Sequence, residues 1–172
     1  MDTKKKLILS LYRQHKATQS KLHKLTYLFW ECTLRCNFNC MHCGSDCTRQ
    51  AAVPDMPKED FLRVLADIRP HVNPHKTMIV LTGGEPLVRK DLAECGQAMY
   101  DMGYPWGFVT NGWGLEEKRL QSLLNAGLRS VTVSLDGYTE ESHDWFRGKQ
   151  GSWLRAINAI SRVVSTPDLV YD

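Results

Sequence analysis

The sequence lacks long hydrophobic runs, a strong net charge and a leader-like start. No apolar run approaches the ~18 residues that cross a membrane, so we expect no membrane span. The basic first residues are followed by only a short apolar segment, Leu7–Leu9, without a small-residue cleavage site, which argues against a signal peptide. A formal charge of +3 is too mild to indicate nucleic-acid binding.

Cysteines are present but are not spread along the chain as a disulfide framework would need. Five of the six lie between Cys32 and Cys47. Such crowding is a poor way to staple a chain of 172 residues. We therefore expect reduced thiols, a metal-binding use and a cytoplasmic location.

Three of these cysteines, Cys36, Cys40 and Cys43, are separated by three and then two residues. A short loop with this spacing can aim three thiolates at a small inorganic core. Cubane iron–sulfur clusters usually take four cysteine ligands, so three would leave one iron open to a substrate or cofactor. A structural zinc site is the alternative, although zinc favours Cys-x2-Cys pairs and only Cys40 and Cys43 have that spacing.

Strand and helix patterns alternate along the chain. Strands are predicted at 25–33, 77–82, 106–110 and 129–135, and helices at 58–68, 91–102, 116–125 and 153–164. This order is typical of parallel strands joined by right-handed crossovers. Residues 4–24 predict an amphipathic helix packed on the domain. Leu169–Tyr171 is interpreted as the start of a fifth strand, which would leave the fourth strand as an open edge.

Unusual residues follow the carboxyl end of every predicted strand, where α/β sheets bind their ligands. The cysteine loop follows the first strand and Gly83–Pro86 the second. Asn111–Gly112 follows the third and Ser134–Gly137 closes the fourth. Four such segments in register predict a single site, although Asn111 alone is interpreted as a turn residue.

Taken together, the cysteine triplet, the Gly83-Gly84-Glu85-Pro86 turn and the segment from Ser134 to Asp136 resemble the radical S-adenosylmethionine (SAM) enzymes, over residues 25–165. The resemblance implies an α/β fold: a partial parallel (β/α) barrel of the radical SAM type, with about four βα units present and the C-terminal strands missing. It implies an N-terminal extension at 1–24 and an incomplete core domain at 25–172. We expect the N-terminal part of a longer protein or a truncated gene product.

The resemblance also assigns roles. Cys36, Cys40 and Cys43 would hold a [4Fe-4S] cluster whose open iron binds SAM, and His42 would pack on the adenine. The backbone of Gly83, Gly84, Glu85 and Pro86 would contact the methionyl amine, with Glu85 beside the cationic ligand or supporting the loop. Ser134 and Asp136 would contact the ribose, and Arg147 the SAM carboxylate. The plain alternatives are a surface loop histidine for His42, an ordinary Gly-Gly turn for Gly83–Pro86 and a solvated salt bridge for Arg147.

The implied reaction is reductive cleavage of SAM to a 5′-deoxyadenosyl radical that abstracts hydrogen from a peptide or protein substrate, as in the branch with a SPASM or twitch extension. A flavodoxin- or ferredoxin-type protein would donate the electron. A small-molecule enzyme like the molybdenum-cofactor cyclase and a non-catalytic module that binds a cluster or SAM are the alternatives. Cys32 and Cys95 are interpreted as buried free thiols, and Cys47 has no assigned role.

Overall fold

Five parallel strands form one sheet in the computed structural model, which describes residues 2–171. The strands are β1 (Tyr27–Thr33), β2 (Met78–Gly83), β3 (Trp106–Thr110), β4 (Leu128–Val133) and β5 (Val170–Tyr171). They lie in the sheet in chain order, so each parallel pair is joined by a crossover that contains at least one helix. The predicted parallel α/β arrangement is confirmed.

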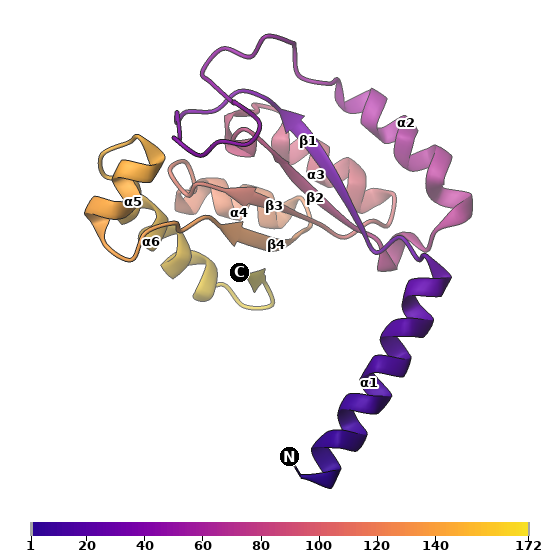
Figure 1. Cartoon of the computed structure of the whole chain (residues 1–172). Helices are drawn as coiled ribbons and strands as arrows, with labels where there is room; N and C mark the ends of the chain where they lie inside the picture. The colour runs from indigo at the N-terminus through magenta and orange to yellow at the C-terminus, as the bar shows by residue number, and fades with distance from the viewer. Residues whose placement is uncertain (1, 172) are drawn as a thin grey trace.

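Six α-helices are present in the described residues (Figure 1). They are α1 (Thr3–Leu22), α2 (Lys58–Ile68), α3 (Leu92–Asp101), α4 (Glu117–Asn125), α5 (Glu140–Arg147) and α6 (Ser152–Val164). The four predicted crossover helices are α2, α3, α4 and α6, and each bound agrees within one residue. Short 3₁₀ turns occupy Arg69–His71, Pro74–Lys76 and Pro86–Val88.

Helix α5 lies outside the predicted helices. Its eight residues begin with a capping box, in which the Thr139 side chain accepts from the backbone N–H of Ser142 and the Ser142 side chain accepts in return. Two of its aromatic residues, Trp145 and Phe146, are exposed. The helix therefore lacks the continuous apolar face from which a helix is recognised in a sequence.

Alternate strand residues point into a buried layer between the sheet and its helices. Ile79, Leu81, Trp106, Phe108 and Val131 are each at most 1% exposed. Trp30 of β1 stacks on Phe61 of α2, with ring centroids 4.2 Å apart. The indole N–H of Trp106 donates to the Ala126 carbonyl at 3.0 Å, so this ring buries its area without leaving its donor unpaired.

The opposite face of the sheet carries no helix within residues 2–171. Tyr27 and Phe29 of β1 are 60% and 62% exposed there. With Val80 and Val109 they line a shallow hollow of about 490 Å³. One face of the sheet is thus packed and the other open, as in an incomplete barrel.

The N-terminal helix does not pack on the domain, contrary to the prediction. Helix α1 leaves the sheet at the start of β1 and extends away from it, and none of its residues is buried (Figure 1). Leu7, Ile8 and Leu11 are 57–61% exposed. The helical spacing of these apolar residues thus predicted the helix correctly, but their side chains pack on no other element of the described chain. No helix among residues 2–171 combines the length and apolar composition needed to cross a membrane.

The interpretation of Leu169–Tyr171 as the start of a fifth strand is confirmed by β5. Its two residues pair with Ser130 and Val131 of β4. The edge of β4 is therefore partly covered rather than fully open, which corrects the expectation of an unprotected edge.

Candidate functional site

The loop after β1, residues 34–57, carries the three spaced cysteines and is closed at its base. The hydroxyl of Thr33 donates to the Asp55 carboxylate (2.7 Å), and Arg35 forms an ion pair with the same carboxylate. Although burial alone would raise it, these hydrogen bonds hold the pKa of Asp55 below its usual value. The N–H of Cys36 donates to the Thr48 carbonyl at 2.8 Å. The start and end of the loop are therefore held beside β1.

Cys36, Cys40 and Cys43 are half-buried and line one hollow of about 290 Å³ beyond the carboxyl ends of β1 to β4. Each following loop adds to its wall. Among the lining residues are His42, Gly83, Gly84, Glu85, Asn111, Ser134, Asp136 and Arg147. Of the predicted site residues only Pro86 is missing, and it is buried at the start of a 3₁₀ turn. The loops that the sequence predicts to form a single site do lie around a single hollow.

The two glycines after β2 allow its loop to approach the cysteine loop closely. A Cβ on Gly83, whose φ is +112°, would lie 2.2 Å from the Thr33 carbonyl oxygen. A Cβ on Gly84 would lie equally close to that of Arg35. The N–H groups of Gly84 and Glu85 donate to these two carbonyls at 2.7 and 3.0 Å. Glycine is required here because side chains would separate two hydrogen-bonded segments.

Glu85 supports the wall of the hollow from within. Its side chain is 1% exposed, and burial raises its pKa above the usual value. Its carboxylate accepts from the N–H of Leu87 at 3.1 Å, from the Thr110 hydroxyl at 2.8 Å and from the N–H of Asn111 at 2.7 Å. Of the two expected roles, the geometry favours the supporting one, since the carboxylate joins the loop after β2 to the end of β3.

Arg147, at the end of α5, reaches the hollow between two of its walls. Its guanidinium forms an ion pair with the Asp136 carboxylate and lies 3.7 Å, through Nη1, from Cys40 Sγ. The Arg147 side chain is only 12% exposed. It is therefore neither a solvated surface pair nor a free cation, and a ligand carboxylate would share it with Asp136.

Helix α5 is fixed to the cysteine loop. The N–H of Met41 donates to the Phe146 carbonyl at 3.0 Å, and the rings of His42 and Phe146 meet edge to face. Below them, the buried ring of His143 accepts from the N–H of Asp136 at 3.1 Å. The predicted role of His42 on an adenine ring is not tested by these contacts, but its imidazole does border the hollow.

The other cysteines differ in their surroundings. Cys32 and Cys95 are fully buried, and burial raises the pKa of each to about 12, as expected for inert core thiols. Cys47 is 4% exposed and lines the hollow, and its N–H donates to Cys43 Sγ at 3.3 Å. Burial raises the pKa of Cys47 to about 11. Its contribution is thus a backbone donor to a neighbouring sulfur.

One contact of the site has no counterpart in the sequence prediction. The Asn111 amide donates to the Asn37 side chain at 2.7 Å, while its carbonyl oxygen accepts from the N–H of Trp113 at 3.0 Å. Asn111 therefore makes the predicted turn and also ties β3 to the cysteine loop. The sequence did mark Asn111 as a polar residue at the end of a strand, but nothing in it identifies Asn37 as the hydrogen-bond partner of Asn111.

The donor set fits an iron–sulfur cluster better than a single ion. A cluster takes each thiolate on a separate iron, so its ligands surround a volume rather than a point. Within residues 2–171 no three His, Cys, Asp or Glu side chains converge closely enough to hold one metal ion. The three thiols that line one hollow fit such a cluster.

Comparison with known proteins finds relatives among curated proteins and among solved structures. The AdoMet-dependent heme synthase of Methanosarcina barkeri is 32% identical over 131 residues, which cover 76% of this chain and 37% of that protein. The PqqA peptide cyclase of Rhizobium meliloti is 34% identical over 127 residues, covering 74% of this chain and 33% of that protein. This chain therefore matches about a third of the length of these relatives.

Among solved structures, SuiB of Streptococcus suis bound to the precursor peptide SuiA aligns with a TM-score of 0.66 at 18% identity, over 90% of this chain and 34% of SuiB. SuiB bound to S-adenosylmethionine aligns with a TM-score of 0.64. At such identities the likeness concerns the fold, and it matches the predicted partial barrel. Residues 30–166 match the Radical SAM superfamily, and with the shared fold and the cysteine-lined hollow this shows that the chain belongs to that superfamily.

Proposed function

We propose that this chain carries the catalytic core of a radical SAM enzyme that acts on a peptide or protein. The observation that carries the proposal is the single hollow lined by Cys36, Cys40 and Cys43 together with the loops after β2, β3 and β4. A bound [4Fe-4S] cluster, when reduced, supplies the electron that splits SAM into methionine and a 5′-deoxyadenosyl radical. The chain's own residues hold and orient the two cofactors.

In this proposal Cys36, Cys40 and Cys43 would hold the cluster, and SAM would bind beside it in the same hollow. Arg147 gives the carboxylate a cationic partner on the wall formed by α5. The loop of Gly83 and Gly84 offers backbone groups without side-chain bulk.

The rest of the SAM molecule would lie beside the same wall, because Asp136 forms an ion pair with Arg147 and its carboxylate lies 3.8 Å from His42 Nε2. Ser134 and Asp136 offer a hydroxyl and a carboxylate to the ribose diol, and His42 a flat ring to the adenine. The three residues line the same hollow as the thiols, which supports this orientation.

The substrate class rests on the relatives. Their names include a peptide cyclase, and SuiB was solved with a precursor peptide. The heme synthase and Fe-coproporphyrin III synthase of Methanosarcina barkeri favour a porphyrin-type small molecule as the second candidate. The two substrate classes can be distinguished by measuring which compound, a precursor peptide or an iron coproporphyrin, increases the formation of 5′-deoxyadenosine.

Anaerobic reconstitution with iron and sulfide, followed by dithionite and SAM, tests the catalytic claim. We expect about four irons per chain, and 5′-deoxyadenosine as a product. Changing Cys36, Cys40 or Cys43 to Ala should abolish cluster binding, while Cys95→Ala, in the core, should retain it. A full cluster in all three single variants would refute the ligand assignment, and a cluster that binds SAM without cleaving it would leave a non-catalytic module.

A further inference from the structure

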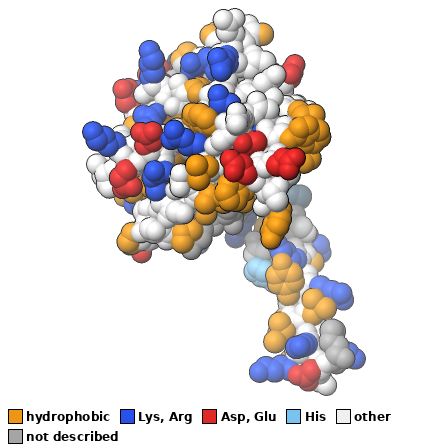
Figure 2. Space-filling view, turned by 90° about the vertical axis from the view of Figure 1, so that its left-hand side faces the viewer, with side chains coloured by type: hydrophobic (Ala, Val, Ile, Leu, Met, Phe, Trp, Pro, Cys, Tyr) orange, Lys and Arg blue, Asp and Glu red, His pale blue; other side chains and the backbone are white. Residues whose placement is uncertain are grey.

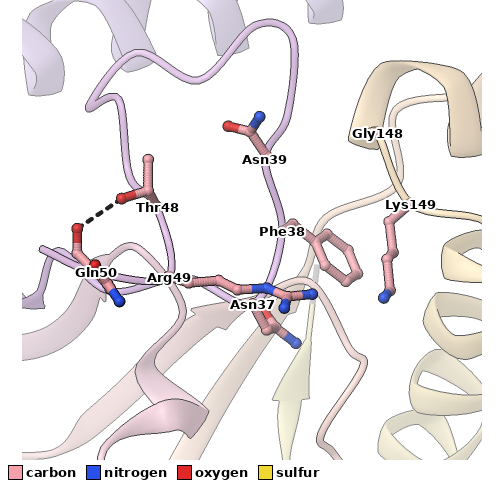
Figure 3. A pocket seen from close by; sticks show the side chains of 8 residues that line it. All are labelled: Asn37, Phe38, Asn39, Thr48, Arg49, Gln50, Gly148 and Lys149. Atoms are coloured by element: carbon pink, nitrogen blue, oxygen red, sulfur yellow. Dashed lines mark hydrogen bonds between the residues drawn. The ribbon is translucent and has the colours of Figure 1, made fainter.

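A second hollow lies on the outer side of the cysteine loop, behind the site. It has a volume of about 420 Å³ and is bounded by residues 37–39, residues 48–50 and the turn of Gly148 and Lys149 after α5 (Figure 3). Figure 3 shows Arg49 and Lys149 entering it from opposite sides of Phe38. A third hollow, of about 330 Å³, adjoins it and shares Asn37, Arg49 and Lys149.

Both outer hollows are cationic. No Asp or Glu lines either of them, whereas Arg35, Arg49 and Lys149 do. Arg35 is neutralised by Asp55, but Arg49 and Lys149 have no ion-pair partner among the described residues. Figure 2, which faces this side of the molecule, shows Lys and Arg side chains spread over it with Asp and Glu side chains among them. The neighbouring Arg155 lies 3.8 Å from Glu116, so the positive excess of this surface comes from Arg49 and Lys149.

An aromatic ring forms the floor between these cations. Trp113 is half-buried, with Lys149 Nζ 4.8 Å and the Arg155 guanidinium 5.3 Å from its ring centroid. Phe38 meets Trp113 edge to face at 5.6 Å. Lys149 and Arg155 are thus held against an aromatic ring, and we call Arg35, Arg49, Trp113, Lys149 and Arg155 the outer basic surface.

Cys36 connects this surface with the proposed cluster site. The residue lines the inner hollow of the site and also the third hollow on the outside. Cys36 therefore borders both the proposed cluster site and the outer basic surface. Electron transfer slows steeply with distance, and a partner seated on this surface would lie beside Cys36, one of the proposed ligands of the cluster.

We propose that the outer basic surface is the docking site of a small acidic one-electron carrier protein, such as a flavodoxin, which delivers the electron past Cys36. This inference rests on the proposed function, because it needs a cluster to reduce. Charge complementarity favours this occupant: a carrier with carboxylates around its redox group would meet Arg49 and Lys149, and opposite charges steer association. An acidic substrate segment would suit the same charges but gains nothing from the proximity to Cys36.

The test uses the double variant Arg49→Glu with Lys149→Glu, against a matched double reversal on the exposed helix α1, Arg13→Glu with Lys16→Glu. Two quantities are measured at low ionic strength: the Kd of an oxidised acidic flavodoxin by calorimetry, and the rate at which reduced flavodoxin bleaches the reconstituted cluster. We expect the outer double variant to lose about tenfold or more in both, and the α1 variant to stay near wild type. Reduction by dithionite and the iron content should be unchanged in both variants.

Equal flavodoxin affinity and bleaching rate in all three proteins would overturn the docking site while leaving the proposed function intact. Loss of affinity for a polyglutamate peptide with an unchanged flavodoxin rate would assign the surface to an acidic peptide and overturn it as well. A wild-type chain that folds but forms no cluster would instead refute the proposed function, and this inference with it.

Discussion

The guanidinium of Arg147 forms an ion pair with the carboxylate of Asp136 at the rim of the hollow that the three spaced cysteines line. The pair joins the end of α5 to the loop after β4. A SAM carboxylate that binds here would take one face of a guanidinium that already has a protein partner. The ion pair then fixes the fork in place before the ligand arrives.

Replacing Arg147 with Ala should weaken SAM binding to the reconstituted protein. Loss of one charge-assisted contact costs about 1.5–3 kcal/mol, or roughly 10- to 150-fold in Kd. Equilibrium dialysis with labelled SAM measures it, and Arg129→Ala, an exposed arginine of β4, is the matched control. An unchanged Kd in an Arg147→Ala protein with full iron content would remove Arg147 from the SAM site.

Gly84→Ala should disrupt the site although only one methyl group is added. The new Cβ would lie 2.2 Å from the backbone oxygen of Arg35, which cannot move without breaking the contact between the two loops. We expect a lower thermal midpoint and lower iron content after reconstitution. Gly114→Ala, in the turn after β3 and outside the hollow, meets only the Leu87 side chain at an ordinary 3.6 Å and should behave as wild type. Equal iron content in the two variants would contradict this account.

Glu85→Ala should destabilise the fold by about 3 kcal/mol, because it leaves three donors of a buried cluster of hydrogen bonds without their acceptor. Urea unfolding measures the change, with the exposed Glu117→Ala on α4 as control. Because burial raises the folded pKa of Glu85, the part of its stabilisation that depends on its protonation is present below the ordinary Glu pKa of about 4.3 and is lost as pH rises through the folded pKa. A loss of stability no larger in Glu85→Ala than in the control would contradict the supporting role.

Asp144 should give the opposite pH dependence. Burial raises the pKa of Asp144. Its carboxylate accepts from the N–H of Trp153 at 2.8 Å, from the Ser152 hydroxyl at 2.7 Å and from the N–H of Gly151. Together these hydrogen bonds lower the pKa by more than burial raises it, so the net shift is downward. Its contribution is present above the ordinary Asp pKa of about 3.9 and is lost as pH falls through the folded pKa. Asp144→Ala should cost about 2 kcal/mol at pH 7, because it uncaps α6, and less at low pH. A constant difference across this range would refute the assignment.

Much of the fold was predictable because its helices and strands follow from the local spacing of apolar residues. Residues 58–68 and 106–110 were placed without error, since a helix face and a continuous apolar strand each have a distinct repeat. The prediction that α1 packs on the domain was wrong for the same reason. The spacing of Leu7 and Leu11 indicates that one face of the helix is apolar, but it does not indicate what covers that face. Helix α5 was missed because its start signal, Thr139 with Ser142, precedes exposed aromatics rather than an apolar stripe.

The candidate site was predictable as a set of loops but not as a network. Strand ends meet at one edge of a parallel sheet, so residues as far apart as Cys36 and Ser134 were expected to converge, and both line the hollow. The contact of Asn37 with Asn111, across 74 positions, depends on side-chain packing that no local pattern encodes. The same holds for the pairing of Arg147 with Asp136.

The measurement that tests the central claim most directly is EPR of the anaerobically reconstituted, dithionite-reduced chain, with and without SAM. The account predicts a reduced four-iron signal whose shape changes when SAM is added, because SAM binds the iron that Cys36, Cys40 and Cys43 leave open. A cluster signal indifferent to SAM, or no cluster in a folded chain, would contradict it.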